Sequence, residues 1–115
     1  MVGLYKLVDG VIIRVDNVEE WALSFEEARR VALDSSWPFH VSTVFLGADH
    51  NFTGGSPPLF FETMTFLGPY GDFHCERCST LEEARNQHAR VLLEVSNLLW
   101  KTKALWRYWV ASLAE

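Results

Sequence analysis

The 115-residue sequence has no long apolar run and only two cysteines. None of its hydrophobic stretches approaches the ~20 residues that are needed to cross a bilayer, so we expect no membrane span. The first residues also lack the basic segment and apolar run of a signal peptide. We therefore expect a cytoplasmic protein, in which Cys75 and Cys78 remain reduced thiols.

Positive charge is scarce as well. Ten Lys and Arg stand against 15 Asp and Glu, which gives a net charge of −5. Only residues 81–115 lean positive, with five bases against four acids. Proteins that bind duplex nucleic acid usually carry a basic patch that neutralises phosphates. Direct binding of duplex nucleic acid is therefore not expected.

Apolar and aromatic residues are plentiful, at 49% and 14% of the chain. This content and length predict a single domain over residues 1–115, with an α+β core at 1–99 and a Trp-rich C-terminal helix at 100–115. Five tryptophans are many for so small a core, so part of this aromatic surface is expected at an interface.

Turn and capping signals predict the first elements. Asp9-Gly10 separates two apolar runs and predicts a hairpin of residues 4–8 and 11–15. Asn17 with Glu20, and Ser24 three residues before another glutamate, resemble helix caps. Apolar residues at helical spacing then predict one helix that ends near residues 34–36.

The remaining chain predicts strands at 41–46, 59–67 and 73–78, and a long helix from Thr80 to about residue 99. Thr80 and Glu83 form a capping box. The order β-β-α-β-β-(β)-α-α indicates an α+β fold, in which a small antiparallel sheet packs against two or three helices.

A polar loop at residues 47–58 is explained least well by core packing. Asp49 and His50 in this loop are suited to binding a metal or nucleotide, or to supplying a base for hydrolysis. Alternatively, Asp49 and Asn51 hydrogen-bond the backbone of their own loop. Strand alternation places Glu62 on the more apolar face, between Phe60 and Met64.

A buried carboxylate requires a partner, and Glu62 has three candidates in His50, Arg77 and His88. Alternatively, Glu62 lies at a sheet edge and its carboxylate reaches water. His88 falls on the apolar stripe of the long helix, where a histidine is usually a core residue with its hydrogen bonds satisfied. We expect His50, Glu62 and His88 to converge on one side of the sheet if they form a site.

The tail carries the second candidate surface. Its aromatic and basic residues suit docking on a partner protein or a second copy of the chain. The alternative is that they complete the core as an amphipathic helix. The residues of this candidate partner-binding surface are Trp100, Trp106, Arg107, Tyr108 and Trp109.

Three motifs occur in a fixed order: VSTVFLG at 41–47 with DHNF at 49–52, PLFFETM at 58–64, and Arg77 before STLEEA at 79–84 and His88. In this order and spacing, about half of the chain resembles a family of small proteins that phages and prophages encode, chiefly in actinobacteria. The resemblance implies a viral origin and the host cytoplasm, but no reaction. The shared motif includes the five candidate polar-site residues Asp49, His50, Glu62, Arg77 and His88.

Cys75 and Cys78 have the spacing of half a zinc site, which His88 or His50 would complete. A convincing site needs a second pair, and the family that the chain resembles usually has an aromatic residue in place of Cys78. We therefore expect no cofactor, with zinc on Cys75, Cys78 and His88 as a weak alternative.

Together these features favour a non-enzymatic accessory protein that binds a host or phage protein, for example a host-defence antagonist such as an anti-CRISPR. One alternative is a small metal- or nucleotide-binding protein or hydrolase that uses Asp49, His50 and Glu62. The other alternative is a structural or assembly protein of the virion. Self-association through the tail is compatible with each.

Overall fold

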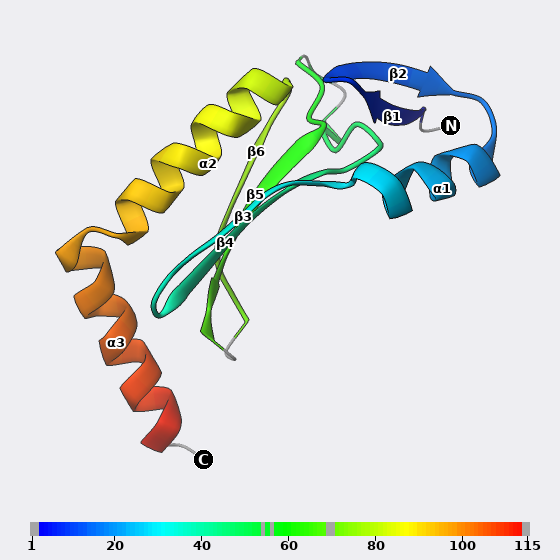
Figure 1. Cartoon of the computed structure of the whole chain (residues 1–115). Coiled ribbons are helices and arrows are strands. Elements are labelled where there is room, and N and C mark those ends of the chain that lie inside the picture. Colours follow the sequence, from blue (N-terminus) through cyan, green and yellow to red (C-terminus); the bar gives the residue numbers. More distant parts are fainter. Residues whose placement is uncertain (1–2, 54, 56, 69–70, 114–115) are drawn as a thin grey trace.

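The computed structural model describes residues 3–53, 55, 57–68 and 71–113 (Figure 1). The expected α+β class is confirmed, and the elements follow the order β-β-α-β-β-β-β-α-α. A two-stranded and a four-stranded antiparallel sheet pack against the helices. Within the described residues, the helices are too short or too polar to cross a membrane.

The N-terminal unit contains a hairpin and a helix. β1 (Leu4–Val8) and β2 (Val11–Val15) pair across the Asp9-Gly10 turn, as predicted. Both turn residues have positive φ, at 49° and 81°, which is why Asp-Gly suits the turn. The helix α1 (Val18–Ala28) begins after Asn17, whose side chain caps it. The second expected cap is wrong, because Ser24 lies inside α1.

The prediction of a helix up to residues 34–36 is also wrong. α1 ends at Ala28, and the next residues form β3 (Arg30–Ser36), which pairs with β4 (Phe39–Phe45). The helical spacing of apolar residues continues to Ala32, but the ladder of hydrogen bonds to β4 outweighs this weak local preference.

The four-stranded sheet has the order β3-β4-β5-β6, with β5 (Phe61–Leu67) and β6 (Asp72–Cys78). The helix α2 (Leu81–Val95) starts at the predicted capping box of Thr80 and Glu83 and covers one face of the sheet (Figure 1). Four of its residues are buried against the strands: Ala84, His88, Val91 and Val95.

The core between the sheet and α2 consists of two clusters of buried residues. One contains Phe39, Val41, Leu67, Val91 and Val95, and the other contains Phe45, Phe60, Phe61, Cys78 and Ala84. Tyr5 and Phe25 pack against the second cluster and thereby join the N-terminal unit to the sheet. The backbone carbonyl of Gly47 strengthens this junction, because it accepts hydrogen bonds from Tyr5 N and Trp21 Nε1.

The tail is helical, as predicted. α3 (Leu98–Leu113) is separated from α2 by a break at Ser96-Asn97, so it begins slightly before residue 100. Its contact with the sheet includes Arg107, whose guanidinium lies 4.8 Å from the centre of the Phe73 ring. Most of the described side chains of α3 are exposed, so this helix is not a closing layer of the core.

Candidate functional site

Asp49 and Asn51 brace the backbone of the polar loop. Asp49 Oδ1 accepts hydrogen bonds from the backbone N–H of Leu59 at 2.7 Å and of Asn51 at 2.8 Å. These two bonds lower the pKa of the Asp49 carboxyl. The Asn51 side chain donates to the carbonyls of Gly55 and Pro57. The alternative in which these residues hydrogen-bond their own loop is therefore the one that the structure shows.

His50 is oriented by the same loop. Its Nδ1 donates to the carbonyl of Ala48 at 2.9 Å, and its ring lies 5.4 Å from the ring of Phe52. These local contacts leave it without a hydrogen bond to Glu62 or His88 among the described residues.

Glu62 lies on the opposite face of β5 from the one that was expected. The buried face contains Phe61, Thr63 and Thr65, whereas Glu62 is half-buried on the face that α2 does not cover. One of its three expected partners is correct, because Arg77 Nε donates to Glu62 Oε2 at 2.9 Å across the β5–β6 pair. A partly exposed pair of this kind contributes about 0–1 kcal/mol.

His88 is buried between α2 and the sheet and anchors a chain of hydrogen bonds. Its Nε2 lies 2.7 Å from Asp34 Oδ2, and its Nδ1 lies 2.8 Å from Thr43 Oγ1. Thr43 Oγ1 is 2.7 Å from Thr63 Oγ1, which donates to Gln87 Oε1 at 2.9 Å. Sequence patterns missed Asp34, Thr43 and Thr63, because they come from strands whose pairing only the fold reveals.

The order Asp34, His88, Thr43 is that of a carboxylate, base and hydroxyl nucleophile in hydrolases. However, Thr43 is fully buried, so a substrate cannot reach its hydroxyl. The array instead satisfies polar groups in the interior, as buried polar side chains generally require. The expected contact of His88 with Glu62 is wrong, and His50, Glu62 and His88 do not converge on one side of the sheet.

Cys75 and Cys78 alternate along β6, so Cys75 is exposed and Cys78 is buried. Among the residues that the structure describes, no group of three or more His, Cys, Asp or Glu side chains is placed to hold a metal ion. Burial, together with the charges of Glu83 and Glu76, raises the pKa of the Cys78 thiol to about 11. A thiol of this kind is mostly protonated at neutral pH and is a poor nucleophile.

The Cys78 thiol should therefore react slowly in the folded protein. In a Cys75→Ser variant at pH 8, we expect iodoacetamide to label folded Cys78 at least ~100-fold more slowly than the same thiol in urea, because two pKa units lower the thiolate fraction about 100-fold. Mass spectrometry of timed samples measures both rates. A Cys78→Ala variant, which reports Cys75, should be labelled readily. Equal rates for Cys78 in folded and unfolded protein would contradict its burial.

The most exposed aromatic surface lies on α3. Trp106 and Trp109 are 63% and 53% exposed, and their ring centres lie 5.5 Å apart. We call this surface the α3 face; its exposed apolar residues are Leu105, Trp106, Trp109, Val110 and Leu113. These positions recur at helical spacing, so they form one stripe. The pattern that suits an amphipathic helix is present, but its apolar stripe faces away from the core.

Other predicted tail residues have different surroundings. Tyr108 is half-buried, and its ring lies beside Gly68 at the end of β5. Arg107 stacks on Phe73, and the side chain of Trp100 lies outside the described part of the chain. Thr102, Lys103, Trp106 and Arg107 surround a hollow of about 480 Å³. Two basic side chains beside an exposed tryptophan suit an acidic, partly apolar binding partner.

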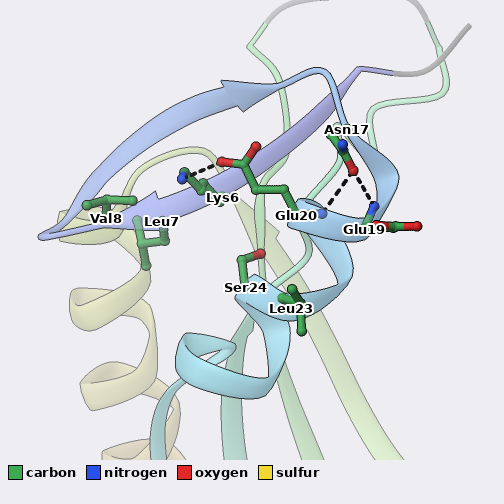
Figure 2. Close-up of a pocket in the computed structure, with 8 residues that line it drawn as sticks. All are labelled: Lys6, Leu7, Val8, Asn17, Glu19, Glu20, Leu23 and Ser24. Carbon is green, nitrogen blue, oxygen red and sulfur yellow. Dashed lines mark hydrogen bonds and ion pairs between the residues drawn. The ribbon is translucent and has the colours of Figure 1, made fainter.

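A second pocket lies at the other end of the molecule, between β1 and α1, with a volume of about 380 Å³ (Figure 2). We call it the α1 pocket. Its wall combines apolar side chains with charged ones, and Lys6 Nζ lies 2.7 Å from Glu20 Oε1 within it. Sequence analysis did not identify this pocket, because its lining comes from two elements that meet only in the fold.

Comparison of the chain with models of protein families, with curated proteins and with solved structures finds no match.

Proposed function

We propose that the protein is a phage-encoded accessory protein that binds a host or phage protein through the α3 face. The observation that carries this proposal is the exposure of Trp106 and Trp109 side by side on α3, most of whose described side chains are exposed. Large exposed apolar patches on small proteins mark interaction sites, and tryptophan is among the residues that dominate binding energy at interfaces. The resemblance to phage and prophage proteins supports the viral origin.

The chemistry of the α3 face suggests the kind of partner. The α3 sequence contains Lys101, Lys103 and Arg107 and no acidic residue. A partner with an acidic rim around an apolar groove would match both the charge and the stripe. Antagonism of a host defence system, as by an anti-CRISPR, is one function that such docking would serve.

Replacement of Trp106 and Trp109 by alanine should weaken partner binding at least ~30-fold and leave the fold intact. Both side chains are exposed, so circular dichroism and the melting temperature should change little, whereas loss of a tryptophan hot spot costs about 2 kcal/mol, or roughly 30-fold in Kd. The measurement is affinity capture of tagged protein from infected cells, followed by titration with the captured partner.

Phe52→Ala is the matched control, because Phe52 is an aromatic residue that is 75% exposed and belongs to the polar loop, not to α3. It should capture the partner as the wild type does. Capture that survives loss of both tryptophans would place the binding surface elsewhere.

A further inference from the structure

The α1 pocket has the character of a groove for a basic amphipathic helix. Its apolar lining comes from Leu7, Val8 and Leu23, and Leu23 is 59% exposed on α1 (Figure 2). Helices with an apolar stripe commonly bind in grooves of this composition. A pocket of mixed apolar and polar lining with a volume of about 380 Å³ lies within the range that accepts the side chains of a ligand.

The glutamates at the rim of the α1 pocket favour binding of a positively charged helix. Of the four glutamates of α1, which carries no base, Glu19 and Glu20 line the pocket. Lys6, the basic residue in the pocket wall, is paired with Glu20, so it does not offset Glu19 at the same rim. An acidic rim attracts basic groups and repels acidic ones, which sets the sign of the partner.

A helix with the complementary properties is present in the same chain. α3 carries three bases, no acid and the exposed stripe of the α3 face. We propose that the α1 pocket binds the α3 face of a second copy of this protein. The inference rests on the proposed function of the α3 face, and it names one partner for that face. A symmetric α3–α3 pair is disfavoured, because the three bases of α3 would find no acidic residue on the other copy of the same helix.

The geometry requires assembly between molecules. α1 and α3 lie at opposite ends of a molecule that is 49 Å long, so α3 cannot fill the α1 pocket of its own chain (Figure 1). Contact between two different surfaces is heterologous, and it produces head-to-tail chains or closed rings. The free α3 face of a terminal copy stays available for another protein, so partner binding and self-association compete for one surface.

Complementation between two variants tests the inference. Trp106→Asp disables the α3 face, and Leu23→Asp disables the α1 pocket; both side chains are exposed, so both variants should fold. The wild type should show a mass that rises with concentration and falls with salt. Each variant alone should remain at the 13.2 kDa of one chain. An equimolar mixture should form a dimer of twice that mass and stop there, because each copy keeps one intact surface.

Light scattering after size-exclusion chromatography measures these masses. If Leu23→Asp alone still dimerises, the contact is α3–α3 and the inference is overturned. A wild type that stays monomeric at every concentration up to ~1 mM also overturns it, since this limit corresponds to a binding free energy of only about −4 kcal/mol. In that case, capture of a host or phage protein that depends on Trp106 would leave the proposed function intact, so the two failures are distinguishable.

Discussion

Replacement of Gly47 by alanine should destabilise the protein by about 2–5 kcal/mol. Gly47 has a φ of 73°, a conformation that costs an L-residue about 1–2 kcal/mol. A Cβ at this position would also lie 2.6 Å from Phe25 Cε1 and 2.8 Å from Trp21 Nε1, which is too close. Overpacking of this kind typically adds 1–3 kcal/mol. The free energy of unfolding in urea measures the total effect.

The structure also predicts which part of the Gly47→Ala variant loses stability. The Gly47 carbonyl holds Tyr5 and Trp21, so a shift of this backbone should loosen β1, β2 and α1 from the sheet. Hydrogen exchange should accelerate in that unit and change less in α2.

Gly71→Ala is the matched control for Gly47→Ala. Gly71 has a φ of 88°, and a Cβ there would meet no atom within 4 Å. It should cost only the ~1–2 kcal/mol of the conformation itself. If the two variants are equally stable, the aromatic junction at Gly47 is looser than the structure indicates.

Replacement of His88 by leucine should destabilise the protein by about 2–4 kcal/mol. Leucine fills much of the same space, but it removes the hydrogen bonds to Asp34 and Thr43. Loss of a partner from a buried polar group costs about 1–3 kcal/mol, and the bond to a carboxylate adds to this. The measurement is again the free energy of unfolding.

A double variant tests directly whether His88 and Thr43 stabilise the fold through their hydrogen bond. When both members of a buried hydrogen bond are replaced by apolar groups, the change can be nearly neutral. His88→Leu with Thr43→Val should therefore cost less than the sum of the single changes, with a coupling of about 0.5–3 kcal/mol. Glu62→Gln is the control at a partly exposed pair and should cost at most about 1 kcal/mol. Strict additivity would show that His88 and Thr43 act independently.

The outcome for His88 also decides between a structural and a chemical role. A large loss of stability with partner binding retained in the remaining folded protein agrees with a histidine that satisfies the core. Normal stability with a specific loss of function would instead give the buried array a chemical role.

Local signals in the sequence determined several elements correctly. Asp9-Gly10 specified its hairpin, Asn17 specified the start of α1, and Thr80 with Glu83 specified the start of α2. Each of these depends on interactions within a few residues, so neighbouring sequence carries the information. The apolar stripe of α2 was also readable, since periodicity records which face is buried.

Tertiary structure decided the features that depend on distant partners. Residues 30–36 form a strand because they pair with β4, although the helical spacing of apolar residues continues from α1 to Ala32. The buried face of β5 carries Thr63 and Thr65, so hydrophobicity selected the wrong face for Glu62. Thr63 tolerates burial because Thr43 and Gln87 bond its hydroxyl.

The candidate sites likewise combine features that the sequence determined with features that depended on the tertiary structure. The sequence by itself determined the α+β class, the main helices and the aromatic stripe of the tail, because these depend on periodicity and composition. Only the tertiary structure decided that Asp49 braces its loop, that His88 bonds Asp34, and that Trp106 is exposed. The physical reason is that burial and hydrogen-bond partners are properties of packed elements, which one segment of chain does not contain.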